Sequence, residues 1–235
     1  MRFNYDDNQD NNQQRPNKPV NLYIGENFAV RVDSWIKFRN LITNLNKGGI
    51  ISCDFQLIKA PIDRQSLSSG ARKMLSVVNA GGNSINSEAF SYEMLRRCFM
   101  ARLYQVENEV LYSIYGGKMT DYVCYLFDMK IGVSVTRHME QHGNYIHKKK
   151  KKKKSLLMRK LEGIVQSSRN SHEKWAKQIL HVWVPDKHTA NIVTDEYNTM
   201  DNDVKSNTVV IVTTTEECDF IYKNCKSVFI PANME

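Results

Sequence analysis

The sequence predicts a mixed α/β domain, and two observations carry that prediction. The 235-residue chain alternates between segments whose apolar residues recur at helical spacing and short runs rich in β-branched residues. With 41% hydrophobic residues it can bury a sizeable core, and a chain of this length favours one domain over two. Because successive strand, helix and strand segments favour parallel pairs with right-handed crossovers, we expect helices packed on a common sheet.

The first part of the chain predicts a tail and three elements. Residues 1–19 are rich in Asn, Gln and Asp and predict a disordered polar tail ahead of a single domain over residues 20–235. Apolar residues at helical spacing predict a helix over residues 27–46, and alternating side chains predict a strand over residues 50–58. A second helix is expected over residues 67–78.

The second part of the chain predicts a longer succession of elements. It begins with a helix over residues 87–103, which Ser87 can cap and which has one apolar stripe. The elements expected after it are three strands over residues 109–115, 120–127 and 131–137, a helix near 155–168, a strand over 178–184, a helix over 190–197 and a strand over 208–214.

This order of elements resembles the PD-(D/E)XK superfamily, which has the restriction-endonuclease-like fold. The core of that fold is a helix, a three-stranded meander, a helix and a further strand, and the resemblance covers about residues 84–215. Residues 20–83 would then form an N-terminal helix and strand extension. The segments GVSVTR at 132–137 and KQILHVW at 177–183 also resemble an uncharacterised eukaryotic protein family.

The resemblance implies a candidate magnesium site. In the superfamily, an Asp near the second strand and an acidic-x-Lys triplet on the third hold Mg²⁺ and a nucleophilic water, often with a Glu of the first helix. Magnesium prefers oxygen ligands, and a lysine can stabilise charge that develops on phosphate. The matching residues here are Asp121 and Asp128 as metal ligands, Lys130, and Glu93, with Glu88 as a second candidate from the helix.

The threading of one hairpin leaves an alternative open. If the chain reverses at residues 128–130, as turn preferences favour, the third strand is 131–137 and presents Ser134 and Thr136 where the acid and the lysine are expected. Hydroxyl groups are weak magnesium ligands, so such a site would be catalytically silent. A non-catalytic binding or assembly domain is therefore the leading prediction. The alternative is a Mg²⁺-dependent nuclease, and no cofactor is expected otherwise.

The positive charge of the chain is local. The formal net charge is +8, from 33 basic and 25 acidic residues, and seven of the basic residues form one run. Without that run the net charge is +1, so the rest of the domain has no general basic field to attract nucleic acid. The run lies in a lysine-rich loop at 138–154 and comprises Lys148, Lys149, Lys150, Lys151, Lys152, Lys153 and Lys154. These lysines make nucleic acid the first partner to test, although a solvated loop would look the same.

The sequence also bears on location. No stretch approaches the roughly 20 apolar residues that a membrane helix requires, and the first twenty residues lack the apolar segment of a secretory signal. We therefore expect no membrane partner and an intracellular location, either cytoplasmic or nuclear. The sequence predicts neither a protein partner nor an oligomeric state.

Overall fold

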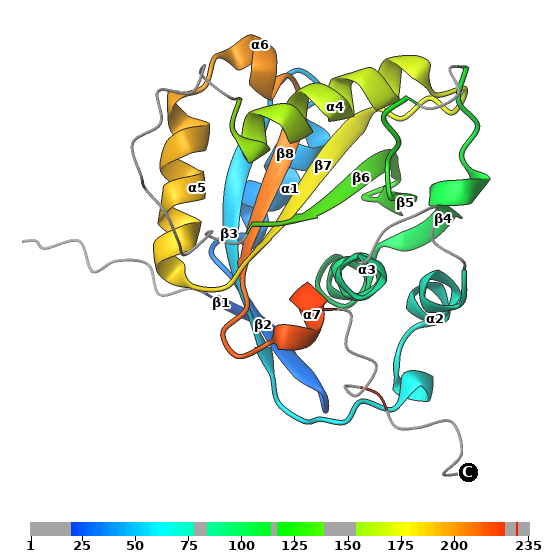
Figure 1. Ribbon diagram of the computed structural model, residues 1–235, viewed down its shortest axis with the longest axis vertical. Coiled ribbons are helices and arrows are strands. Elements are labelled where there is room, and N and C mark those ends of the chain that lie inside the picture. Colours follow the sequence, from blue (N-terminus) through cyan, green and yellow to red (C-terminus); the bar gives the residue numbers. More distant parts are fainter. Residues whose placement is uncertain (1–19, 78–83, 114–116, 139–153, 224–228, 230–235) are drawn as a thin grey trace, which may run out of the picture.

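The protein has a mixed α/β architecture built on one sheet. The computed structural model describes residues 20–77, 84–113, 117–138, 154–223 and 229. Its eight strands pair in the order β1-β2-β3-β8-β7-β6-β5-β4, and helices cover both faces of the sheet (Figure 1). The predicted tail and all of the predicted 138–154 loop except its two end residues lie outside the described residues.

The N-terminal strands form one end of the sheet. Strand β1 (Val20–Ile24) pairs antiparallel with β2 (Phe28–Val32), and β2 pairs antiparallel with β3 (Gly49–Leu57). Helix α1 (Trp35–Thr43) connects β2 to β3, and β3 runs parallel to β8. Residues 20–57 therefore extend the sheet of the predicted core.

The helix predicted over residues 27–46 is wrong in its first half. Phe28 and Val32 are four residues apart, as in a helix, but Val30 between them is also buried, and this alternation is that of the strand β2. Ser34 then begins α1, because its side chain accepts a hydrogen bond of 3.1 Å from the backbone N–H of Lys37.

The remaining elements follow nearly the predicted order. They are α2 (Ser69–Ser76), α3 (Ile85–Phe99), β4 (Arg102–Val106), β5 (Tyr122–Leu126), β6 (Met129–Arg137), α4 (Leu156–Asn170), β7 (Lys177–Val184), α5 (Lys187–Thr199), α6 (Asn202–Lys205), β8 (Thr208–Thr214) and α7 (Asp219–Lys223). Strands β4, β5 and β6 form an antiparallel meander, whereas β6, β7 and β8 are parallel.

The first strand of the meander lies earlier than predicted. Met100 has a left-handed backbone with φ of 57° and ends α3, so the chain turns directly into β4 at Arg102. The segment predicted as this strand, residues 109–115, follows a short 3₁₀ turn, Glu107–Glu109, and its described residues form no named strand. An apolar pattern alone could not separate the end of the helix from the start of the strand.

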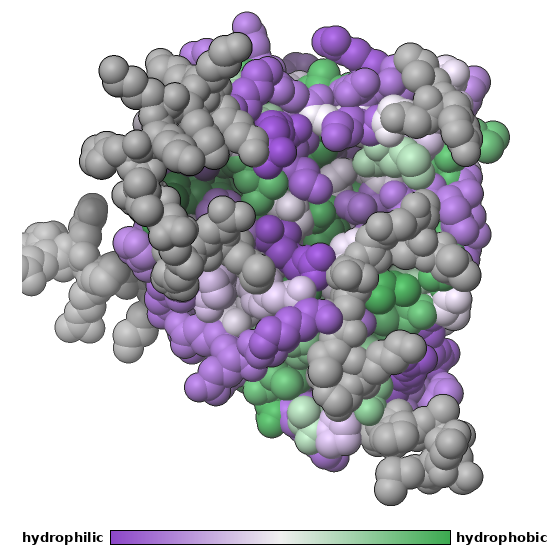
Figure 2. Space-filling model, in the orientation of Figure 1, coloured by the Kyte–Doolittle hydropathy of each residue, from purple (hydrophilic) through white to green (hydrophobic). Residues whose placement is uncertain are grey.

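Two hydrophobic cores lie on opposite faces of the sheet. Helices α1, α2, α3 and α7 pack on one face, and α4 and α5 pack on the other (Figure 1). Along β7, Ile179, His181 and Trp183 point to the first core, and Leu180 and Val182 point to the second. On the visible face, hydrophobic side chains reach the surface only in small separate patches (Figure 2). Within the described part of the chain, no helix is both long and apolar enough to cross a lipid bilayer.

A buried hydrogen-bond network fixes α3 on the sheet. Nδ1 of His181 lies 2.8 Å from Oγ of Ser91 on α3, and Nε2 lies 2.8 Å from Oγ1 of Thr213 on β8. Ser91 Oγ is also 2.8 Å from the hydroxyl of Tyr122 on β5. All four side chains are fully buried, and burial lowers the pKa of His181 to about 3. The ring therefore stays neutral, and the network links α3 to strands β5, β7 and β8.

We expect His181 to make the protein acid-sensitive. Its pKa is lower in the folded state than its ordinary value of 6.5, so the unfolded state binds a proton first and stability falls as the pH decreases from about 6.5 towards 3. The contribution is at most about 1.4 kcal/mol per pH unit. Urea unfolding between pH 7 and pH 4 measures it. His181→Gln should have a shallower slope, and exposed His172→Gln should keep the wild-type slope. Equal slopes in all three proteins would contradict the assignment.

Candidate functional site

Asp121 lies at the start of the middle strand of the meander. It directly precedes β5, and its backbone N–H donates to the carbonyl of Val133 on β6 over 3.0 Å. One of its carboxylate oxygens accepts a hydrogen bond of 2.5 Å from the backbone N–H of Val135. The preceding residue, Thr120, is buried and donates through its hydroxyl to the same Val133 carbonyl over 2.9 Å. The Asp121 side chain is therefore held in one place beside β6.

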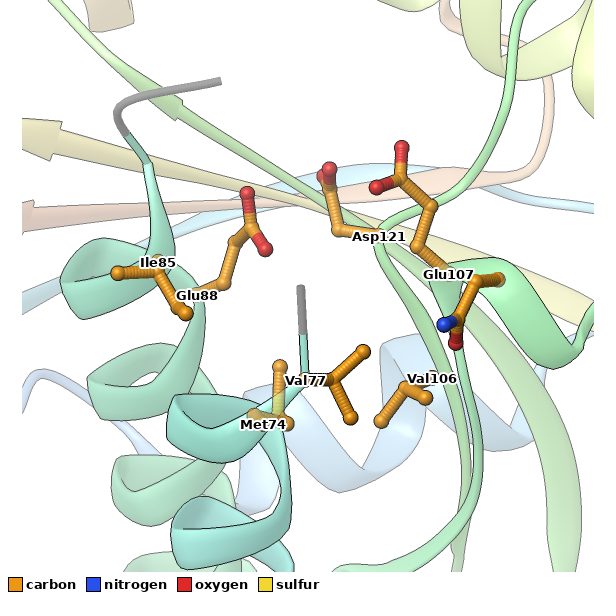
Figure 3. Close-up of a pocket in the computed structure, with 8 residues that line it drawn as sticks. Met74, Val77, Ile85, Glu88, Val106, Glu107 and Asp121 are labelled. Carbon is orange, nitrogen blue, oxygen red and sulfur yellow. The ribbon is translucent and has the colours of Figure 1, made fainter. Parts of the chain in front are cut away.

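Three carboxylates point into one small cavity (Figure 3). Asp121 and Glu107 approach it from the ends of the meander strands, and Glu88 approaches it from the first turn of α3. The cavity measures about 20 Å³, which is room for one water-sized group. Its apolar walls include Met74 and Val77.

The cavity raises the pKa of Asp121 to about 8. Removal from water is the largest cause, and the negative charge of Glu88 is the next. The hydrogen bond from Val135 and the positive charge of Lys160 oppose this rise. Asp121 therefore holds a proton at neutral pH, unless a cation or another positive group compensates for its charge.

The position of Glu88 follows from how α3 docks. The indole N–H of Trp183 on β7 donates to the carbonyl of Ser87 over 3.0 Å, and the Asn86 side chain donates to the carbonyl of Phe220 over 3.2 Å. These two contacts hold the first turn of α3 against the sheet and against α7. Glu88, only 7% exposed, is directed from this turn towards Asp121 (Figure 3).

A cleft with positive side chains adjoins Asp121 on its other side. The cleft has a volume of about 340 Å³, and its wall includes Lys118, Arg159 and Lys160. Ser134 and the carboxylate of Glu162, which pairs with Lys154, also line it. Arg159 and Lys160 belong to the first half of α4, and Lys118 precedes β5 in the chain. The aliphatic part of Lys118 lies over Gly163, where an added Cβ would be 3.5 Å from it. Asp121 thus separates an acidic cavity from a basic cleft.

The hairpin between β5 and β6 places Asp128 and Lys130 away from Asp121. The chain reverses at Phe127 and Asp128, which both have positive φ, as in the two-residue turns typical of hairpins. Strand β6 starts at Met129, two residues before the predicted start. Since β5 rises about 3.3 Å per residue, the turn lies roughly 20 Å from Asp121.

The side chains of the hairpin have other partners. Asp128 is 98% exposed and lies 3.5 Å from Arg102, and Lys130 forms an ion pair of 2.8 Å with Glu173. Lys130 also lies over the ring of Tyr104. The structure therefore does not bring Asp121, Asp128 and Lys130 together.

The register places the hydroxyl side chains on the third strand of the meander. Ser134 and Thr136 lie on β6, point to the face that α4 covers, and are 8% and 9% exposed. Ser134 shares the basic cleft with Asp121. Of the predicted alternative set, Ser134 is therefore the residue that lies beside Asp121.

Glu93 has a structural position on the far side of α3. Its carboxylate pairs with Arg97 at 2.8 Å and accepts hydrogen bonds from the backbone N–H and the hydroxyl of Ser68, at 3.1 Å and 2.5 Å. Ser68 caps the start of α2, so Glu93 joins α2 to α3. Of the two helix carboxylates, Glu88 is the one beside Asp121.

The carboxylates around Asp121 are of the type that binds a hard cation, but they are not arranged to hold one. Carboxylate oxygens are the ligands that Mg²⁺ prefers. In the ranges that the structure describes, however, no group of three or more His, Cys, Asp or Glu side chains is arranged to hold a metal ion.

Sequence patterns did not identify Glu107, Lys118, Arg159 and Lys160. These residues come from three separate segments, and none belongs to a short motif. The lysine run predicted to contact nucleic acid lies outside the described residues, except for Lys154, which pairs with Glu162 at 2.5 Å.

Comparison with known proteins places this α/β domain beside one curated relative. The chain is 33% identical over 217 residues to the "AAC-rich mRNA clone AAC4 protein" of Dictyostelium discoideum. The match takes in 88% of this chain and 32% of that protein, so the chain spans about a third of the relative's length. No family model and no solved structure matches the chain.

We expect Asp121→Asn to change how stability depends on pH. The folded state keeps the proton of Asp121 up to about pH 8, whereas an unfolded Asp ionises near 3.8, so Asp121 makes the wild type less stable as the pH rises between these values. Asparagine keeps the acceptor for Val135 and cannot ionise. The variant should gain stability relative to the wild type from pH 5 to pH 8.5, measured by urea unfolding.

A matched control is Asp128→Asn, the same substitution at an exposed position with positive φ. It should follow the wild-type pH dependence. If Asp121→Asn also follows the wild type, the carboxyl of Asp121 is not protonated in the folded state and the assignment is wrong.

Proposed function

We propose that this chain is a non-catalytic binding or assembly domain on a restriction-endonuclease-like scaffold and that it contacts nucleic acid. The comparison with that fold is supported by the order α3, β4, β5, β6, α4, β7, in which an antiparallel meander is followed by a helix and a parallel strand. Folds of one kind host many functions, so the side chains of the site must decide between them.

The basic cleft is the observation that carries this proposal. Lys118, Arg159 and Lys160 line the cleft of about 340 Å³ beside Asp121. Among the described residues, no acidic side chain forms an ion pair with any of these three cations. Clustered cations favour a polyanion, because each phosphate that they neutralise releases condensed counterions. The apolar Met119 and Leu156 in the same wall add contact surface.

The third strand supports the non-catalytic part of the proposal. Ser134 and Thr136 on β6 are neutral, and Lys130 on the same strand is paired with Glu173. The strand that carries an acid and a lysine in the nucleases therefore carries neither at this end. A ligand in the cleft would be held by charge and hydrogen bonds rather than cleaved.

We expect the cleft variant Lys118→Gln/Arg159→Gln/Lys160→Gln to bind nucleic acid more weakly. Three lost phosphate contacts should lower affinity about tenfold or more near 0.1 M salt and reduce the slope of log K against log salt by about 2 to 3. Fluorescence anisotropy with labelled single- and double-stranded oligonucleotides over a range of salt measures both quantities.

The matched control removes the same charge from the opposite face of the sheet. Lys37→Gln/Arg39→Gln/Lys47→Gln changes exposed residues in and just after α1, which packs on the face away from α4. This control should keep the wild-type salt slope. If both triple variants lose affinity equally, binding depends on net charge and the cleft is not the contact surface.

A Mg²⁺-dependent phosphodiester hydrolase is the second candidate. It is favoured by the convergence of Glu88, Glu107 and Asp121 on one cavity and by the Lys160 charge, which lowers the raised pKa of Asp121. Such an enzyme would use Asp121 as the central ligand and Lys160 as the cation. Since the described carboxylates are not arranged as a metal site, we derive no catalytic step from them.

The binding proposal predicts no Mg²⁺-dependent cleavage. Labelled DNA and RNA incubated with the full chain should stay intact in about 10 mM Mg²⁺, a concentration that saturates weak magnesium sites. They should stay equally intact in EDTA. Cleavage that requires Mg²⁺ and is lost in both Asp121→Asn and Glu88→Gln, but kept in Asp128→Asn, would establish the hydrolase instead.

A further inference from the structure

The walls of the basic cleft place cations on two sides of one space. Arg159 and Lys160 come from α4, and Lys118 comes from the segment before β5, with its aliphatic part over Gly163. Among the residues that the structure describes, Lys118 and Lys160 have no ion-pair or hydrogen-bond partner. The guanidinium of Arg159 makes a long contact of 3.4 Å with the carbonyl of Ser155. These cations are therefore available to an anion.

A buried hydroxyl group lies on the sheet side of the same cleft. Ser134 on β6 lines the cleft and is 8% exposed. In the described part of the chain its hydroxyl has no hydrogen-bond partner, whereas the neighbouring carboxylate of Asp121 accepts from the backbone N–H of Val135. Because a buried polar group without a partner costs free energy, an acceptor that enters the cleft gains a hydrogen bond at little cost in desolvation.

The charges of the cleft favour an anion with about two negative charges. Three cations and two carboxylates line it, namely Lys118, Arg159, Lys160, Asp121 and Glu162. Since Glu162 pairs with Lys154, the three cations face one remaining carboxylate, which leaves two positive charges in excess. A phosphate at the end of a nucleic acid carries about −1.5 to −2 charges at neutral pH, whereas each phosphate within the chain carries one. The terminal group is therefore the closer match.

The acidic cavity limits how a nucleic acid can lie in the cleft. Glu88, Glu107 and Asp121 converge on this cavity, which adjoins the cleft at Asp121 (Figure 3). Carboxylates repel phosphates, so a nucleic-acid strand that continues past Asp121 on this side is disfavoured. The cleft volume of about 340 Å³ is also at the lower end of the range for sites that hold one small molecule. The cleft thus suits the end of a nucleic-acid strand better than its middle.

From these observations we propose that the basic cleft binds a nucleic-acid strand by its terminal phosphate. Lys118, Arg159 and Lys160 contact the oxygens of this phosphomonoester, and the hydroxyl of Ser134 donates a hydrogen bond to one of them. Met119, which is 38% exposed in the same wall, contacts the terminal nucleoside. The inference rests on the function proposed for the cleft, since it specifies which part of a nucleic acid the cleft recognises.

Fluorescence anisotropy with three forms of one short oligothymidylate tests this preference. The forms have a 5′-phosphate, a 3′-phosphate, or hydroxyl groups at both ends, and the label is on an internal base. We expect one of the phosphorylated forms to bind the full chain about tenfold more tightly than the hydroxyl form, since the terminal phosphate adds charge and charge-assisted hydrogen bonds. The form that binds more tightly identifies which end is recognised.

Variants of the cleft test where the terminal phosphate binds. Lys118→Gln/Arg159→Gln/Lys160→Gln should bind the phosphorylated and hydroxyl forms with equal affinity. Ser134→Ala should weaken the phosphorylated form about fivefold or more and leave the hydroxyl form unchanged, because only a hydrogen bond to the terminal group is lost. The matched control is Thr136→Val, which removes a buried hydroxyl of β6 that does not line the cleft, and it should keep the wild-type preference. Unchanged far-ultraviolet circular dichroism would show that each variant folds.

Three outcomes would overturn the proposal. One is equal affinity of the wild type for all three forms. Another is a preference for the terminal phosphate that the triple variant and Ser134→Ala both keep, because this group would then bind elsewhere. The third is competition by thymidine monophosphate as strong as that by the phosphorylated oligonucleotide, because the ligand would then be a free nucleotide.

The hydroxyl form separates a failure of this inference from a failure of the proposed function. If the three forms bind equally and the triple variant weakens all of them, the cleft still binds nucleic acid and only the recognition of its end is wrong. If the triple variant binds the hydroxyl form as the wild type does, or if no form binds, the function proposed for the cleft is wrong as well.

Discussion

The hydrogen bonds that join α3 to the sheet are the interactions on which the candidate site depends. Ser91, at the middle of α3, is hydrogen-bonded to Tyr122 and to His181, and all three side chains are fully buried. A buried polar group without its partner is costly, so these contacts allow one rotation and one depth of the helix. With α3 fixed, Glu88 at its start faces Asp121.

The placement of charge around Asp121 explains why binding is favoured over catalysis. A small cavity with several carboxylates raises the pKa of Asp121, and a cleft with three cations lies directly beside it. The two regions share Asp121. The charged side chains of the cavity are all acidic, whereas cations outnumber carboxylates in the cleft. A phosphate is attracted to the cleft and repelled by the cavity, unless a cation neutralises the acids. The cations of the cleft therefore suffice to bind an anion, whereas chemistry at the carboxylates would also require a bound cation.

Most of the elements could be predicted, but the register of one hairpin could not be decided from sequence. Residues 178–184 and 208–214 were expected as strands because apolar and β-branched residues follow one another there, and strands β7 and β8 confirm this. The reversal at Phe127 and Asp128 was missed by one residue, because Phe127 is an unusual residue for a position with φ of 48°. The observed turn agrees with the register that turn preferences favoured, in which Asp128 and Lys130 lie away from Asp121.

The sequence by itself determined the α/β class and the order of elements in the second half. It also limited the site to two alternatives, one with Asp128 and one with Ser134 beside Asp121. These follow from local periodicity and turn chemistry, which act over a few residues. Only the tertiary structure decided which side chains meet. Glu107, Lys118 and Lys160 are far apart in the chain and reach Asp121 because the sheet and α4 bring their segments together. Glu93 was a reasonable candidate by type, but the rotation of α3 directs it to Ser68, and no local pattern records that rotation.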